Sequence, residues 1–120
     1  MFQYDSLKTD LPLNEIVMKN IIGCQWNFFY SWYNDDDIKD AILFFPDDKS
    51  VDLKFYSKEK KNTTVVKGLW TLDNANVITM TFKLGTTTTI YRCMSDAKMI
   101  IGMIKNNKTI NSGICIGMRI

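Results

Sequence analysis

One aromatic stretch, residues 23–33 (GCQWNFFYSWY), places the strongest demand on the rest of the chain. Six of its last eight residues are aromatic, and aromatic side chains favour β-strands. Side chains two residues apart point to the same side of a strand, so one face carries four rings: Trp26, Phe28, Tyr30 and Trp32. Rings of this size need apolar surroundings, so we expect the remaining segments to enclose this face.

The rest of the chain alternates apolar and polar residues in short segments that end at polar turns. With the aromatic stretch, they predict eight strands, at residues 23–33, 38–45, 51–56, 63–72, 77–84, 86–94, 98–104 and 110–120. Near-regular spacing of this kind indicates a sandwich or a barrel. No connection is long enough for the returning crossover of a Greek key, and closure removes the exposed edges of an open sheet. The sequence therefore predicts an all-β fold, an eight-stranded antiparallel up-and-down β-barrel, in which the first strand near Phe28 pairs with the last strand near Ile116.

The length and composition fit a single domain over residues 1–120. With 46% hydrophobic residues, a chain of 120 residues has enough apolar material for one core. Residues 1–22 are expected to form a polar arm and a short helix, and residues 23–120 the barrel. The helix is expected to begin at Leu11-Pro12 and to stop at Gly23, since proline suits a first helical turn and glycine a helix end. Its apolar residues at helical spacing are Leu13, Ile16, Val17 and Ile21. Of these, Leu13, Ile16 and Val17 are expected to cap one end of the barrel.

Several classes of partner are disfavoured by composition. The net charge of +2 gives no general affinity for nucleic acid. The first ten residues lack the features of a signal peptide, and no apolar run approaches the length of a membrane helix. Three isolated cysteines without any histidine fit neither a disulfide framework nor a zinc site. We therefore expect a reduced, cytoplasmic protein without a metal, a cofactor, a nucleic-acid partner or a membrane partner.

Two short motifs resemble those of the lipocalin-like (calycin) barrels. Gly23-Cys24-Gln25-Trp26 follows the expected helix and resembles the Gly-x-Trp signature of that family, with one additional residue before the tryptophan. Residues 68–78 (GLWTLDNANVI) look like a glycine–tryptophan strand and hairpin of small lipocalin-like domains. In such barrels a basic residue of the last strand packs across the first-strand tryptophan, and Arg119 is the matching position. Its alternation with Ile116 and Met118 would nevertheless point it outward. The resemblance implies binding of a small, mostly apolar molecule inside the barrel, or protein contact at its rim.

Charged residues fall mostly in turns. Asp35–Asp37, Asp47-Asp48 and the lysines at 58, 60 and 61 are each predicted to be solvated turns rather than ion sites, because Asp and Lys are common at such positions. Arg92 leaves two alternatives open. If Ile90 and Met94 point inward, Arg92 does too and requires an anion, such as a ligand carboxylate. If Tyr91 and Cys93 point inward, Arg92 lies in water.

No nucleophile–base constellation is apparent. The chain has no histidine and no Gly-x-Ser-x-Gly elbow, and no base lies near its cysteines in the sequence. The sequence therefore predicts no catalytic residue and a protein that is not an enzyme. Five methionines fall in predicted strands and are interpreted as core residues that fill irregular space: Met80, Met94, Met99, Met103 and Met118.

Two functions remain, and the volume of the interior separates them. The first is a binding protein that holds a small apolar molecule in the barrel. The second is a protein–protein interaction module, of an inhibitor or immunity type, whose barrel is filled by its own side chains. An eight-stranded barrel is just wide enough for either arrangement. For the first function, the ligand is expected to enter opposite the helix, and the expected ligand-binding residues are Tyr30, Trp32, Met80, Phe82 and Arg92.

Overall fold

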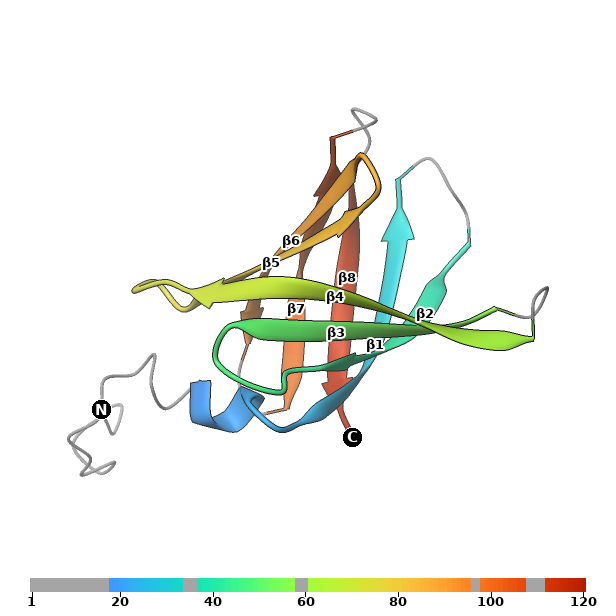
Figure 1. Cartoon of the computed structure of the whole chain (residues 1–120). Helices are drawn as coiled ribbons and strands as arrows, with labels where there is room; N and C mark the ends of the chain where they lie inside the picture. The colour runs from blue at the N-terminus through green and yellow to red at the C-terminus, as the bar shows by residue number, and fades with distance from the viewer. Residues whose placement is uncertain (1–17, 34–36, 58–60, 96–97, 108–111) are drawn as a thin grey trace, which may run out of the picture.

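The computed structural model describes residues 18–33, 37–57, 61–95, 98–107 and 112–120. Eight antiparallel strands follow one another around a closed barrel in sequence order (Figure 1). Their bounds are β1 Gln25–Trp32, β2 Lys39–Phe44, β3 Ser50–Ser57, β4 Asn62–Leu72, β5 Val77–Leu84, β6 Thr87–Ser95, β7 Met99–Asn106 and β8 Ser112–Arg119. The predicted all-β barrel is confirmed.

The barrel closes between its first and last strands. Phe28 lies opposite Gly117 and Phe29 opposite Ile116, so the expected pairing of β1 with β8 is confirmed. The same register places Arg119 opposite Trp26, as the lipocalin-like resemblance implied. Arg119 alternates with the buried Cys115 and Gly117 rather than with the exposed residues of β8, and its side chain is exposed where the strand ends.

One end of the barrel is filled. The aromatic stretch points as expected, since Trp26 and Phe28 are fully buried while Tyr30 and Trp32 are half-buried. Helical residues 18–21 lie beside this filled end, where β8 finishes (Figure 1), and Ile21 packs into the core. Leu13, Ile16 and Val17, expected to cap this end, lie outside the described residues. The buried core contains Trp26, Phe28, Leu43, Phe45, Val51, Trp70, Ile78, Met80, Ile100 and Ile104, among others.

β8 has the opposite facing to that suggested by its isoleucines. Gly113, Cys115 and Gly117 point inward, whereas Ile114 and Met118 are 53% and 50% exposed on the outer wall. The reason is volume: a Cβ added at Gly117 would meet the Phe28 ring at 3.3 Å and Ile100 Cβ at 3.5 Å. At Gly117 a longer side chain would therefore crowd Phe28, Ile100 and Trp26, while the isoleucines of β8 face outward.

The prediction that the strand methionines are core residues is wrong for β6, β7 and β8. Met80 is fully buried, but four of the five strand methionines are between 38% and 58% exposed: Met94, Met99, Met103 and Met118. They occupy the outward positions of β6, β7 and β8, next to the outward isoleucines. They are surface residues of one side of the barrel and not core residues.

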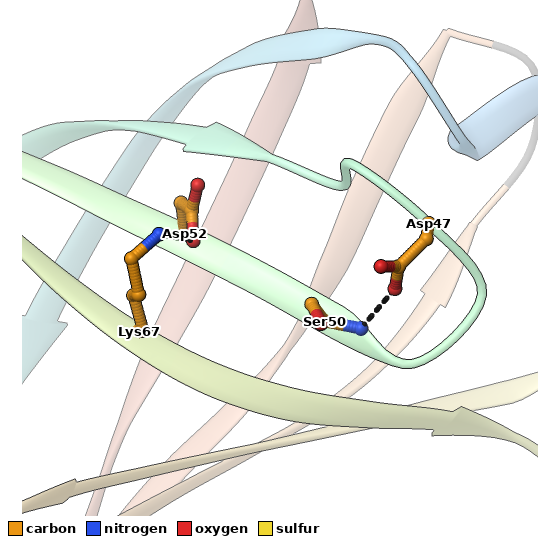
Figure 2. A network of polar contacts seen from close by, with 4 residues as sticks. All are labelled: Asp47, Ser50, Asp52 and Lys67. Atoms are coloured by element: carbon orange, nitrogen blue, oxygen red, sulfur yellow. Dashed lines mark hydrogen bonds and ion pairs between the residues drawn. The ribbon is translucent and has the colours of Figure 1, made fainter.

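Turns between the strands use side-chain acceptors and positive φ. Asp47 Oδ1 accepts hydrogen bonds from the backbone N–H groups of Lys49 and Ser50, at 2.8 and 2.6 Å, and so fixes the β2–β3 turn. Figure 2 shows the bond from Ser50. Beyond that turn, Lys67 Nζ lies 3.4 Å from Asp52 Oδ1 across β3 and β4 (Figure 2). The two-residue β5–β6 turn places Gly85 at φ +60°, a conformation that glycine adopts without the steric cost of a side chain.

Candidate functional site

The open end of the barrel holds a small cavity of about 180 Å³, which we call the mouth cavity. It lies opposite the end beside the helical residues, where β1 finishes and the β5–β6 hairpin turns (Figure 1). Six strands contribute to it, each through inward-facing positions. Its lining residues are Tyr30, Trp32, Lys39, Leu53, Phe55, Val66, Phe82, Leu84, Thr89 and Tyr91.

Aromatic rings in mutual edge contact form the floor of the mouth cavity. Tyr91 is central to them, with its ring centroid 5.5 Å from that of Phe28 at an interplanar angle of 66° and 5.5 Å from that of Phe82 at 89°. Tyr30 lies 6.3 Å from Tyr91 and 6.4 Å from Phe55. Edge-to-face pairs of this kind are favourable beyond the area that they bury. The packed rings therefore separate the cavity from the core at the filled end.

The two tyrosines of the site are neutral hydrogen-bond donors at physiological pH. Burial raises the pKa of Tyr91 well above its usual range, and the pKa of Tyr30 is raised by burial and then by the charge of Asp40. Because both phenols keep their protons, each can donate one hydrogen bond to an acceptor placed in the cavity. Lys39 and Thr89 supply further polar groups among the lining residues.

The structure brings together three of the five expected site residues. Tyr30, Trp32 and Phe82 all line the mouth cavity. Met80 is fully buried and does not line it. Arg92 is exposed on the outer wall, because Tyr91 and Cys93 are the inward residues of β6, so the alternative that leaves Arg92 in water holds and no interior anion partner is needed.

Sequence reasoning missed most of the other lining residues. Phe55 and Leu53 carry a signal, since β3 alternates apolar and charged residues and these two belong to its apolar series. Tyr91 points into the barrel in one of the two alternatives that the sequence leaves open for β6. Val66 and Thr89 lie in segments that carry threonine or valine on both faces. In such segments alternation does not show which side chains point into the barrel.

A buried thiol pair lies behind β7. Cys93 Sγ and Cys115 Sγ are 3.5 Å apart, on strands that flank β7, and Gly102 lies between them in the register. A Cβ at Gly102 would meet the Arg92 carbonyl oxygen and Cys93 Cα, so only glycine lets the two sulfurs approach across this strand. The Cys115 contact and burial raise the pKa of Cys93 strongly, which keeps the thiol protonated. In the described part of the chain, no group of three or more His, Cys, Asp or Glu residues could hold a metal ion.

The outer wall over β6, β7 and β8 carries an apolar surface that sequence reasoning assigned to the core. We call it the outer apolar face; its central residues are Met94, Ile101, Met103, Ile114, Ile116 and Met118. Two hollows of about 890 and 470 Å³ lie on it, and Ile101 lines both.

The charged residues predicted to lie in solvated turns are exposed wherever the structure describes them: Asp37, Asp47, Asp48 and Lys61. Asp35, Asp36, Lys58 and Lys60 lie outside the described residues.

No helix among the described residues is long and apolar enough to cross a membrane.

No protein-family model matches the chain, and no curated protein matches it. A solved structure that aligns with it is that of the S-type phycobiliprotein lyase CPES from Guillardia theta, with 10% sequence identity and a TM-score of 0.48 over 99% of this chain and 98% of that one. Up-and-down barrels of eight strands are also the architecture of the lipocalins. At this level of similarity the comparison gives this chain no family membership, and the closed eight-stranded barrel rests on its own strand pairing.

The comparison also corrects one sequence-based prediction. The aligned protein is named a lyase, which contradicts the prediction that this chain is not an enzyme. At this level of similarity the name of that protein assigns no reaction to the present chain.

Proposed function

We propose that the protein binds one compact apolar molecule, of one or two rings, in the mouth cavity. The observation that carries this proposal is a half-open cavity of about 180 Å³ that is lined mainly by apolar atoms and by aromatic side chains from four strands. An apolar cavity of about 150 Å³ is enough to bind benzene, whereas sites for drug-sized ligands span about 300–1,000 Å³. The size of the cavity therefore favours a small ring system.

The filled end of the barrel argues against a long-chain ligand. Phe28 and Tyr91 lie directly below the cavity, and both are buried in the core that continues to Trp26. An acyl chain would have to displace these rings, and interiors packed at normal density resist such rearrangement. We therefore narrow the expected ligand from any small apolar molecule to a compact one.

The polar groups suggest what else the ligand carries. The neutral phenols of Tyr30 and Tyr91 can each donate a hydrogen bond to a ligand, and the hydroxyl of Thr89 can donate or accept one. A ring with one hydroxyl or carbonyl group would satisfy one of these without placing a charge in a buried site. The sequence-based reason for expecting a ligand carboxylate was an inward Arg92, and that reason fails because Arg92 is exposed on the outer wall.

The test is isothermal titration with p-cresol, 2-naphthol and palmitic acid. Val66→Phe places a ring in the cavity, and Val65→Phe is its matched control, because Val65 is the neighbouring residue of β4 and is 45% exposed on the outer wall. We expect wild type and V65F to bind p-cresol or 2-naphthol at one site, and V66F to lose at least about tenfold in affinity. Trp32→Ala is expected to weaken binding too, since Trp32 lines the cavity.

Two results would reject the proposal. One is the absence of saturable binding of both ring compounds to the wild type at millimolar concentration. The other is equal affinity in V66F and V65F, with circular dichroism showing both variants folded. Palmitic acid binding as tightly as the ring compounds would contradict the narrowing to compact ligands.

Contact with another protein is a second candidate function, favoured by the outer apolar face. Five of its six central side chains are between 50% and 58% exposed. The two functions use opposite sides of the barrel wall, so one does not exclude the other.

A further inference from the structure

One charged side chain belongs to the mouth cavity. Lys39 begins β2, and it alternates with Ala41 and Leu43, which pack in the core, so Lys39 lies on the inward side of the strand. It is opposite Tyr30 of β1 in the register and is half-buried. Among the described residues that line the cavity, Lys39 is the only charged one.

The half-buried state of Lys39 places its charge at the rim of the cavity. A lysine can lay its apolar stem along a wall of apolar side chains while its ammonium group stays in water. The aromatic floor with Tyr30, Tyr91 and Phe55 lies next to it. Lys39 already interacts with another part of the protein, but an ammonium group has three N–H donors and can serve a ligand as well.

Two aspartates lie near Lys39, and neither lines the cavity. Asp37 precedes β2 and is exposed, and Asp40 is exposed on the outward side of that strand. Asp40 is nevertheless close enough to act on Tyr30, whose pKa is raised by burial and then by this charge. An anion deep beside Tyr30 would therefore be repelled by Asp40, whereas an anion at the rim beside Lys39 meets the opposite charge.

Lys39 distinguishes between two kinds of charged ligand. A cage of aromatic rings alone would suit an organic cation such as a quaternary ammonium ion, which is attracted to the ring faces. An ammonium group at the rim repels such a cation and attracts an anion. Because the cavity is half-open, the charge of that anion stays in contact with water and avoids the large cost of burial in the core.

We infer that the ligand of the mouth cavity is an aromatic monocarboxylate, with its ring on the aromatic floor and its carboxylate beside the ammonium group of Lys39. This inference rests on the proposed function and adds the acid group that the compact ring carries. A hydrogen bond between an ammonium group and a carboxylate is charge-assisted, and it is therefore stronger than one to a neutral carbonyl group.

The experiment is isothermal titration of the full chain with 4-methylbenzoate and 4-methylbenzamide, which have nearly the same shape and differ in charge. Lys39→Met keeps an unbranched apolar side chain and removes the charge. We expect K39M to lose about fivefold in affinity for 4-methylbenzoate, the effect of a well-placed ion pair near a surface. It should keep the wild-type affinity for 4-methylbenzamide, because that ligand has no charge to lose contact with.

Lys83→Met is the matched control. Lys83 is exposed near the end of β5 and does not line the cavity, although its neighbours Phe82 and Leu84 do. K83M makes the same change in net charge as K39M. It should leave both affinities unchanged at 0.15 M salt, since the Debye length there is about 8 Å and exposed charges farther apart are largely screened.

Reversal of the charge supplies a second readout. Lys39→Glu is expected to bind benzyltrimethylammonium more tightly than 4-methylbenzoate, whereas the wild type is expected to show the opposite order. Circular dichroism checks that each variant is folded, and Lys39→Gln takes the place of K39M if that variant does not fold.

The outcomes separate this inference from the proposed function. If the wild type binds 4-methylbenzamide but K39M keeps its affinity for 4-methylbenzoate, or loses affinity for both ligands equally, the inference is overturned and the proposed function stands. Tighter binding of benzyltrimethylammonium than of 4-methylbenzoate to the wild type also overturns it. If no ring compound binds the wild type saturably, the proposed function fails and this inference fails with it.

Discussion

Two tryptophans are buried in the core with different partners for their indole N–H groups. Trp70 Nε1 donates a hydrogen bond to the Asp47 carbonyl oxygen at 2.9 Å, and its ring meets Phe45 at a centroid distance of 5.0 Å. Trp26 Nε1 is buried, and among the described residues no acceptor reaches it. An unpaired buried donor is costly, so Trp26 contributes through its volume and not through its polar atom.

This contrast leads to a prediction for two matched variants. Trp26→Phe and Trp70→Phe remove the same atoms from similarly buried sites. Trp70→Phe also removes a hydrogen bond, so we expect it to lower the free energy of unfolding by about 1 kcal/mol more than Trp26→Phe does. Urea denaturation of both variants measures the difference. A larger loss in Trp26→Phe would show that its N–H group has an acceptor after all.

At the scale of elements, the β2–β3 turn depends on one carboxylate. Asp47 is fully exposed, yet the backbone N–H groups of Lys49 and Ser50 hold its pKa below the ordinary value of 3.8. A group whose folded-state pKa is lowered stabilises the fold above its unfolded-state pKa, and this contribution is lost as the pH falls through the folded-state value. The turn therefore weakens below about pH 3.8.

Asp47→Asn tests this link between pH and the turn. At pH 7 the variant is expected to melt at a lower temperature than the wild type, because an amide oxygen accepts weaker hydrogen bonds than a carboxylate. As the pH falls toward 2, the wild type loses its advantage and the two melting temperatures should converge. Thermal unfolding followed by circular dichroism at both pH values measures the gap, and a gap of the same size at pH 2 would contradict the account.

At the scale of the whole molecule, the barrel separates two kinds of surface. Its filled end supplies the core, its open end contains the mouth cavity, and the wall of β6, β7 and β8 presents the outer apolar face. The mouth cavity is too small for the extended ligands that a hollow barrel would admit. The apolar residues that a hollow interior would otherwise hold are instead distributed between a packed core and an exposed wall.

The strands and their closure could be predicted from the sequence, because alternation fixes a period of two and tight turns fix the order. The face of β1 followed from its four rings. The sequence did not show which face of β8 points inward, since both of its alternating series contain small or apolar residues; at Gly117 little space remains beside Phe28, Ile100 and Trp26.

The residues of the site were predicted only in part for a similar reason. Alternation shows that Phe82 and Met80 share a face, but the stagger of the strands determines that Phe82 reaches the mouth and Met80 stays in the core.

The most direct test of the proposed ligand site is a methyl-resolved NMR titration of the full chain with p-cresol. The account predicts that saturable shifts concentrate at Leu53, Val66 and Leu84, which line the mouth cavity, while the fully buried Val51, Ile78 and Ile100 keep their positions. Shifts concentrated at those three buried residues or at Ile101 and Ile114 of the outer apolar face, or no saturable shift at any methyl group, would contradict the claim that the mouth of this barrel is a binding site for a compact apolar molecule.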